Sequence, residues 1–230
     1  GKEKQKYLQQ RISQLITPFV EQFCRISRYF VYFNLFFMSV LSLEILGFVL
    51  AFSPEGKSYF LAIGLAVFFL TGFSYFVLRL YMLAKKPGQL YQLKQQFVQA
   101  CKEIIQFQEG SSEHLMLLAK SLSQLASFLK EKEFRMYEVP RNLEGIEISL
   151  QRFSAWWHWK DVFFVGELLL KEAVDYQIEI VKNAPVHLHT HAALANAYVK
   201  LANLYVENKA YDKHYGRDEK SNVFLMKKKF

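Results

Sequence analysis

Two long apolar runs, separated by a short polar break, constrain this chain more than any other feature. The first covers residues 29–52 with Glu44 as its only formal charge, and the second covers residues 59–83 with Arg79 as its only charge. A run of about 24 residues is about 36 Å long as a helix, which crosses a hydrocarbon core of about 30 Å with some tilt. Large apolar side chains surround both helix axes, whereas a surface helix keeps one polar face. The pattern predicts a transmembrane helical hairpin, and the alternative is a hairpin buried inside a soluble helical protein.

Basic residues flank this hairpin on one side. They precede the first run and follow the second, whereas the break at residues 53–58 holds one lysine and one glutamate. Because loops rich in lysine and arginine stay on the cytoplasmic side of a membrane, we expect both termini in the cytoplasm. Arg79 then lies near the inner end, where its long side chain reaches the headgroups. The flanking basic residues are Lys2, Lys4, Lys6, Arg11, Arg25, Arg28, Lys85 and Lys86.

Glu44 is the one acidic residue within the apolar runs. It lies about 12 Å from the outer end of the hairpin, level with Gly64, Val67 and Thr71, and at a different depth from Arg79. An ionisable group inside a membrane is costly and therefore a functional candidate, for example in an oligomeric transport or channel assembly. The alternative is a protonated glutamate that hydrogen-bonds a neighbouring helix and holds a homo-oligomer together.

The remainder of the chain has room for one further domain. The chain has 230 residues and a net charge of +8, and much of the basic excess lies at the ends and beside the apolar runs. That distribution suits an anionic membrane surface better than nucleic acid. Cys24 and Cys101 both fall on the predicted cytoplasmic side, where a structural disulfide is not expected. The predicted segments are a basic amphipathic helix at 1–28, the hairpin at 29–83, a helical interaction domain at 89–215 and a basic tail at 216–230.

The first segment has apolar residues three and four positions apart, which is typical of an amphipathic helix. They include Leu8, Ile12, Ile16 and Phe19. Pro18 is expected to kink or restart this helix. Two interpretations stay open: the helix lies on the anionic leaflet, or it packs against the helical domain.

The segment at 89–215 predicts several helices joined by short breaks. Helices with narrow apolar seams, at about 89–109 and 112–136, are expected to form an antiparallel pair. Glycine, proline and capping residues mark the expected helix boundaries. These are Lys85-Lys86-Pro87-Gly88, Gly110-Ser111-Ser112, Pro140, Asn142, Asp161 and Asn183-Ala184-Pro185. The expected fold class is all-α, with a transmembrane helical hairpin and a cytoplasmic domain of helical hairpins.

Residues 190–208 and the step after them carry the most informative pattern of this domain. The positions concerned are Tyr198, Leu201, Ala202 and Tyr205, followed by Lys209-Ala210-Tyr211-Asp212. An aromatic residue, a leucine, a small residue and a tyrosine at these spacings resemble the first helix of a tetratricopeptide repeat in degenerate form. In such a repeat the small residue lets two helices approach, and a Tyr-Asp step opens the next helix after a short turn. The resemblance implies stacked antiparallel helix pairs with a groove for a protein or peptide; an unrelated helical bundle is the alternative.

Four aromatic residues and three histidines are the remaining candidate site residues. Trp156 and Trp157, in an unusually aromatic stretch, and Tyr198 and Tyr205 are predicted to contribute to structure or to partner contact. The histidines are His187, His189 and His191. On an extended segment their side chains would share one face and hold Zn²⁺, but a helix that begins inside the motif would separate them, and a His-rich loop is the alternative.

These patterns together predict a non-enzymatic scaffold, anchored in a membrane, that recruits a protein partner through its cytoplasmic helical domain. The second hypothesis is a subunit of a transport or channel assembly that uses Glu44. The chain has no glycine-rich phosphate loop and no catalytic metal or serine motif, so no cofactor is expected. The layout, a hydrophobic hairpin with cytosol-facing helical tails, is also similar to that of chlamydial inclusion membrane proteins, although no motif carries this likeness.

Overall fold

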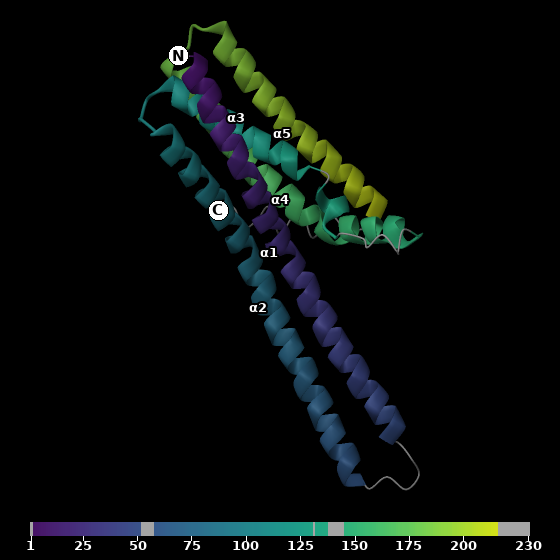
Figure 1. The fold of residues 1–230 in the computed structure, drawn as a ribbon. Helices are drawn as coiled ribbons and strands as arrows, with labels where there is room; N and C mark the ends of the chain where they lie inside the picture. Colours follow the sequence, from purple (N-terminus) through teal and green to yellow (C-terminus); the bar gives the residue numbers. More distant parts are fainter. Residues whose placement is uncertain (1, 52–57, 131, 138–144, 216–230) are drawn as a thin grey trace. The chain divides into compact units, whose positions relative to one another are not determined.

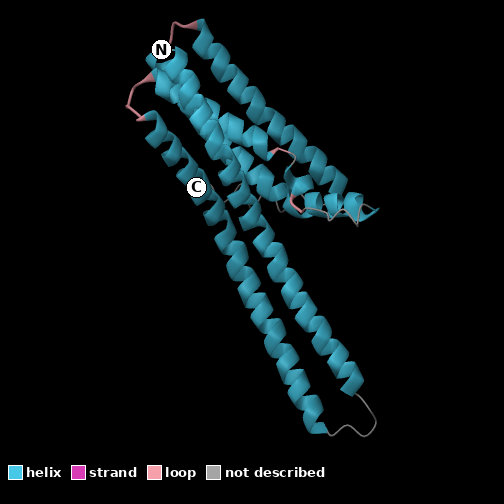
Figure 2. Ribbon diagram, viewed as in Figure 1, coloured by secondary structure: helices cyan, strands magenta, loops and turns pink. Residues whose placement is uncertain are grey.

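The computed structural model describes residues 2–51, 58–130, 132–137 and 145–215 (Figure 1). All of the elements in these ranges are helices, without a strand among them, which confirms the all-α class (Figure 2). They are α1 (Lys2–Ala51), α2 (Ser58–Ile105), α3 (Ser112–Leu129), the 3-10 helix η1 (Lys132–Arg135), α4 (Glu147–Asn183) and α5 (Leu188–Tyr215). The expected turn at 53–57, the expected boundaries at Pro140 and Asn142 and the tail at 216–230 lie outside the described residues.

The chain divides into two compact units that cut across the long helices α1 and α2. Unit 1 takes the described parts of Gly1–Gln22 and Tyr91–Phe230, and unit 2 is the described part of Phe23–Leu90. The first 22 residues therefore belong to the same unit as the helices after α2. The predicted segment boundaries at residues 28 and 89 stay predictions.

The core of unit 1 is built from one apolar face on each of its helices. Leu115, Leu118, Leu122 and Leu125 of α3 recur three and four positions apart and are each at most 4% exposed. This spacing turns one side of the helix to the core. The matching residues of α4 include Val162, Val165, Leu169, Ala173 and Ile180, which are also buried.

The beginning of α1 and the end of α2 complete this core. Ile12 and Ile16 are 1% exposed, and the ring of Phe19 packs edge-on against the fully buried ring of Phe97, with 5.2 Å between centroids. Lys120 of α3 donates a hydrogen bond to the side chain of Gln9 over 3.0 Å. Of the two interpretations of the first segment, packing against the helical domain is therefore the one the structure adopts.

A buried ion pair joins α2 to α4 within unit 1. The Lys94 ammonium lies 2.6 Å from a carboxylate oxygen of Glu172, and the lysine side chain is only 5% exposed. The same ammonium lies 4.7 Å from the centre of the Tyr91 ring, a cation–π contact. A desolvated charge of this kind is tolerated only where a partner of opposite sign is present.

Two helix breaks expected from the sequence are absent, and those predictions were wrong: Pro87-Gly88 lies inside α2 and Asp161 lies inside α4. Pro18 lies inside α1, so the helix does not restart there. A proline costs about 3 kcal/mol in a helix interior because it removes one backbone donor and clashes with the preceding turn. Beside Pro18, the buried Ile16 and Val20 offset that cost. At Pro87 the buried apolar side chains lie after the proline, at Leu90 and Leu93.

The ends of three other elements also differ from expectation. The first seam helix ends at Ile105, before Gly110, and Ser111 rather than Ser112 caps α3 by accepting a hydrogen bond from the His114 backbone N–H. The second seam helix ends at Leu129 and is followed by η1, so it does not run on to residue 136. The short turn predicted at Lys209-Ala210 is absent, because α5 continues to Tyr215.

Unit 2 is a helical hairpin held together by polar contacts along its inner side. The Tyr75 hydroxyl donates to the Asn34 side-chain oxygen over 2.7 Å, and Arg79 donates to the same hydroxyl over 3.1 Å. Thr71 donates to a carboxylate oxygen of Glu44 over 2.6 Å, which confirms that these two residues lie at one level. The Tyr75–Asn34 and Thr71–Glu44 hydrogen bonds each join a polar group of one helix to a polar group of the other, whereas the Arg79–Tyr75 bond lies within α2.

The outer surface of this hairpin is apolar and uncovered. Phe36, Leu50 and Phe73 are between 63% and 75% exposed, and many other large apolar side chains between residues 29 and 83 are exposed as well. Two helices, at Tyr7–Leu50 and Leu61–Ile105, are long and apolar enough to cross a membrane. Their most apolar windows have a mean hydropathy of 2.0 and 2.2, and 6% and 0% of the residues in these windows are buried. A hairpin inside a soluble protein would be buried by the rest of the chain, and the described residues do not bury this one.

Candidate functional site

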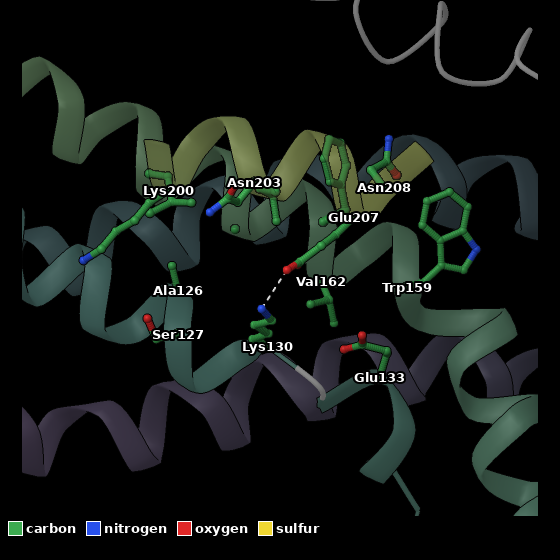
Figure 3. A pocket seen from close by; sticks show the side chains of 14 residues that line it. Ala126, Ser127, Lys130, Glu133, Trp159, Val162, Lys200, Asn203, Glu207 and Asn208 are labelled. Atoms are coloured by element: carbon green, nitrogen blue, oxygen red, sulfur yellow. Dashed lines mark hydrogen bonds and ion pairs between the residues drawn. The ribbon is translucent and has the colours of Figure 1, made fainter. Parts of the chain in front are cut away.

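The candidate site is a groove in unit 1 between α4 and α5, closed on one side by the end of α3 and by η1 (Figure 3). Its volume is about 210 Å³. Sites for drug-sized ligands are usually about 300–1,000 Å³, so this groove suits one large side chain of a partner or a small molecule. Such a pocket for a single anchoring residue is typical of the centre of a protein–peptide interface.

The floor of the groove is apolar and comes mainly from one face of α4. Trp159, Val162, Gly166 and Leu170 follow each other at intervals of three and four residues, which places them along one side of the helix. Trp159 and Val162 are 3% and 8% exposed. From the opposite helix, the two terminal methyl groups of Leu204 lie 3.5 and 3.6 Å from the place that a side-chain carbon on Gly166 would take. A methyl group at position 166 would therefore meet Leu204 in ordinary contact, and a larger side chain would enter the groove.

The rim of the groove is polar. The Lys130 ammonium at the end of α3 meets a carboxylate oxygen of Glu207 on α5 over 2.7 Å, and Figure 3 shows this pair across the opening. Lys200 and Asn203 lie toward one end of the groove, and Asn208 lies toward the other end with Trp159 (Figure 3). The side-chain oxygen of Asn208 is buried and accepts no hydrogen bond from any described residue. An amide oxygen of this kind is suited to receive a backbone or side-chain N–H from a bound peptide.

A hydrogen-bonded cluster beside the groove ties α5 to α4. Glu167 is 7% exposed, and its Oε1 accepts from the Tyr205 hydroxyl over 2.5 Å and from the Lys171 ammonium over 2.6 Å. The Tyr205 ring packs edge-on against Phe163, with 5.7 Å between centroids. Burial raises the pKa of the Tyr205 hydroxyl, and its hydrogen bond to Glu167 raises that pKa further. Tyr205 therefore stays a neutral donor and holds the two walls of the groove at a set distance.

The arrangement of the groove is suited to binding. A largely apolar floor with a charged rim can take an apolar anchor and hydrogen-bond the chain on either side of it. Comparisons with family models, curated proteins and solved structures find no match to this chain. Among the described residues, no group of three or more histidines, cysteines and acidic residues could hold a metal ion.

The four aromatic residues predicted as structure or partner contacts fall into two places. Trp156 and Trp157 lie on α4 outside the groove, 5.4 Å apart between ring centroids, and Phe153 packs on both rings. Trp156 is 38% exposed, so this cluster is partly open to solvent. Tyr205 lies beside the groove in the Glu167 cluster, whereas Tyr198 is half-exposed on the outer side of α5. Partner contact by these four residues stays a prediction.

The small residue of the repeat-like pattern does not lie where that pattern implies. Ala202 is exposed, although a small residue in this position is expected between two helices in contact. The close approach occurs instead between Gly166 on α4 and Leu204 on α5.

The three histidines are divided by the start of α5. His187 precedes the helix, and His189 and His191 lie within it. The ring Nε2 of His191 forms a hydrogen bond with the Pro185 carbonyl oxygen over 2.8 Å. Because the segment is helical from Leu188, the side chains do not share one face as they would on an extended segment.

Glu44 lies in unit 2, whereas the groove residues lie in unit 1. One of its carboxylate oxygens accepts from Thr71, and the other is buried and makes no hydrogen bond with a described residue. A cavity of about 170 Å³ beside it is lined otherwise by apolar residues, among them Ile45, Phe48 and Leu65.

Sequence reasoning missed most of the groove. Lys130, Lys200, Asn203 and Glu207 are ordinary polar residues of helical surfaces, and no spacing rule singles them out. One signal was present: Gly166 is an isolated glycine in a long helical pattern, which often marks a close approach of two helices or a binding site.

Replacement of Gly166 by alanine is expected to raise the free energy of unfolding by about 0.5–1 kcal/mol. Alanine is the better helix former, and its methyl group would meet Leu204 at an ordinary contact distance of 3.5 Å. Thermal unfolding followed by circular dichroism in detergent measures this change. The matched control is Gly110→Ala, which is expected to destabilise because Gly110 has φ +79°. A loss of stability in Gly166→Ala would contradict the described spacing of α4 and α5.

Proposed function

We propose that the chain is a non-enzymatic, membrane-anchored scaffold that recruits a protein partner through the groove of its helical unit. The observation that carries the proposal is the exposure of the hairpin: large apolar side chains between residues 29 and 83 face outward on both helices. In water this surface would be an aggregation site, whereas in lipid it is the expected surface of a membrane helix. Asn34 pairs with Tyr75 and Glu44 with Thr71 across the hairpin, and the exposed Ser39 and Ser42 bond to the backbone of their own helix, so these polar groups are satisfied as membrane insertion requires.

The orientation follows from charge. Basic residues flank the hairpin where the rest of the chain continues, so the positive-inside rule places both termini, and with them unit 1, in the cytoplasm. A cytoplasmic groove with an apolar floor and a mixed-charge rim is suited to an amphipathic peptide or an exposed helix of a partner protein. The proposed domain is similar to a degenerate tetratricopeptide repeat, whose helix pairs bind partners in a comparable groove.

Anchoring is tested by flotation of the full-length chain with vesicles, before and after an alkaline carbonate wash. We expect the chain to stay with the vesicles after the wash, because two helices of the hairpin span the bilayer. Replacement of Phe36 and Phe69 by arginine is expected to reduce that fraction strongly, since each arginine in a span costs about 2.5 kcal/mol or more on insertion. A full-length chain that is soluble and monodisperse without detergent would overturn the anchoring.

Recruitment is tested with the full-length chain in vesicles as bait and Gly166→Trp as the matched variant. The tryptophan would fill the groove, so a partner that uses the groove is expected to be lost from Gly166→Trp and kept by the surface variant Asp175→Asn. Thermal unfolding of both variants shows whether the fold is retained. A partner that binds Gly166→Trp as well as the original chain would contradict the groove as its site.

A second candidate function is a subunit of an oligomeric transport or channel assembly. The favouring observation is the carboxylate oxygen of Glu44 that lacks a hydrogen bond among the described residues. A neighbouring subunit would supply the missing partner, and a protonatable glutamate could then serve conduction. Glu44→Gln and Glu44→Leu separate the two functions: loss of transport with assembly intact favours this candidate, whereas unchanged partner recruitment favours the scaffold.

A further inference from the structure

The outer side of α5 carries an apolar seam that no described residue covers. Leu188, Val199 and Val206 are 84%, 55% and 67% exposed, and Ala192, Ala195 and Ala202 between them are exposed too. Successive members lie four, three, four, three and four residues apart. This alternation is the a/d repeat of a coiled-coil seam.

The inner side of the same helix is apolar as well. Leu194, Leu201 and Leu204 are partly buried toward the rest of unit 1, and Leu204 lies against Gly166 of α4. A helix that is apolar on both sides is normally buried on both. The outer seam of α5 therefore calls for a second helix.

The residues that flank the seam indicate what this second helix is. They are His189, Asn196 and Asn203 on one side and His191, Tyr198 and Tyr205 on the other, with no lysine, arginine, aspartate or glutamate among them. Charged flanks would select a partner of opposite charge, and a helix lying on an anionic leaflet carries basic residues beside its apolar face. Neutral flanks instead allow the seam to meet a copy of itself without repulsion between like charges.

The order of large and small residues also fits an antiparallel pair of copies. About a two-fold axis near Ala197, Leu188 of one chain faces Val206 of the other, and Ala195 faces Val199. Ala192 faces Ala202 in this arrangement, so Ala195 is the alanine that gains a larger partner. In a parallel pair all three alanines would face alanines and leave more unfilled space in the seam. We infer that α5 pairs antiparallel with α5 of a second copy of this chain, through the seam from Leu188 to Val206.

The pairing is expected to be weak in dilute solution and effective on a membrane. The seam is about 27 Å long, which is short for an interface of about 800 Å² per partner. Confinement of both copies to one bilayer raises their effective concentration. This point rests on the proposed anchoring, so anchoring is measured separately in the same samples by flotation.

The test is cysteine crosslinking of the full-length chain in vesicles with a short bismaleimide. Cys24→Ser removes the one partly exposed native thiol, and Cys101 is 1% exposed, with burial raising its pKa to about 12, so it stays unreactive. Tyr198→Cys lies beside the two-fold axis and is expected to give about tenfold more dimer than Phe128→Cys, an equally exposed control on α3. Leu188→Cys and Val206→Cys are each expected to stay at the control level alone, because two copies of either residue would be about 27 Å apart. An equal mixture of Leu188→Cys and Val206→Cys chains is expected to give crosslinked dimers that contain one chain of each variant.

The hairpins of two chains could also associate in the membrane, so a second variant tests the seam of α5 by itself. Ala195→Asp places a carboxylate in the seam at an exposed position, so folding is retained and dimer formation by Tyr198→Cys is expected to fall about tenfold. Undiminished dimer in Ala195→Asp would overturn the inference, and so would Leu188→Cys dimers equal to those of Tyr198→Cys, which would mean parallel pairing. If Tyr198→Cys chains float with the vesicles but give no more dimer than Phe128→Cys, the inference is also overturned, and the seam contacts a different helix or lipid. Chains that do not float with the vesicles contradict the anchoring alone. Crosslinking at high protein concentration then tests whether α5 pairs with α5 of a second copy.

Discussion

Replacement of Glu172 by leucine is expected to lower the free energy of unfolding by about 3–5 kcal/mol. The substitution leaves the Lys94 ammonium, whose side chain is 5% exposed, without its carboxylate. The ring of Tyr91 at 4.7 Å compensates only in part. Burial raises the pKa of the nearby Tyr176 hydroxyl, and the charge of Glu172 raises it further. Chemical denaturation of the full-length chain in detergent measures the effect.

The chain offers a matched control for this prediction. The Lys130–Glu207 pair has nearly the same separation, 2.7 Å against 2.6 Å, but its side chains are 57% and 43% exposed. Glu207→Leu is therefore expected to cost about 1 kcal/mol or less, because water already screens that pair. The double variant Lys94→Met with Glu172→Leu is expected to regain most of the lost stability, since it leaves no buried charge. Equal effects of Glu172→Leu and Glu207→Leu would contradict the burial of Lys94.

Phe97→Ala is the second large effect, with an expected cost of about 3–5 kcal/mol. The Phe97 side chain is fully buried where the end of α2 meets the beginning of α1, and its removal leaves a cavity beside Phe19. The matched control is Phe128→Ala on α3, where the ring is 55% exposed and the expected change is about 0.5 kcal/mol. Comparable losses in the two variants would show that Phe97 is not part of the core.

A companion substitution in α1 tests whether the first 22 residues belong to this core. Ile16 is 1% exposed, so Ile16→Ala is expected to cost about 2–5 kcal/mol in the same assay. A helix that merely rested on the membrane surface would lose membrane affinity in this variant but little folding stability. For the same reason, a fragment that begins at residue 89 lacks part of its core, and binding experiments need the whole chain.

The chain is thus proposed to make two kinds of interaction, one with a partner protein and one with a second copy of itself. The groove between α4 and α5 supplies a pocket for one anchoring side chain, and the outer seam of α5 supplies a surface for a second copy. Pairing of copies would present two grooves together, and a partner with two matching segments would then bind more tightly than either groove alone permits. The two surfaces adjoin at Asn203, but Gly166 belongs to the groove and Ala195 to the seam, so Gly166→Trp and Ala195→Asp are expected to affect them separately.

The sequence by itself determined the helical class, the apolar hairpin and the level of Glu44 opposite Thr71. These features depend on composition and on distances along a helix, which are local properties. It also indicated the apolar faces of Ile12, Ile16 and the leucines of α3, because the spacing of side chains on a helix is fixed.

Tertiary structure alone decided where helices continue and which faces meet. Pro87-Gly88 and Asp161 look like boundaries to local rules, but the helices continue through both. Trp159 and Val162 are buried on either side of Asp161, and Leu90 and Leu93 are buried after Pro87, so packing outweighs an unused cap or a lost hydrogen bond. The groove brings Lys130, Gly166 and Glu207 together from three helices, and the approach of α5 to α4 occurs at Gly166 while Ala202 faces outward. Such choices depend on how separate helical faces fit one another in space, and this information is not contained in the periodicity of any single segment.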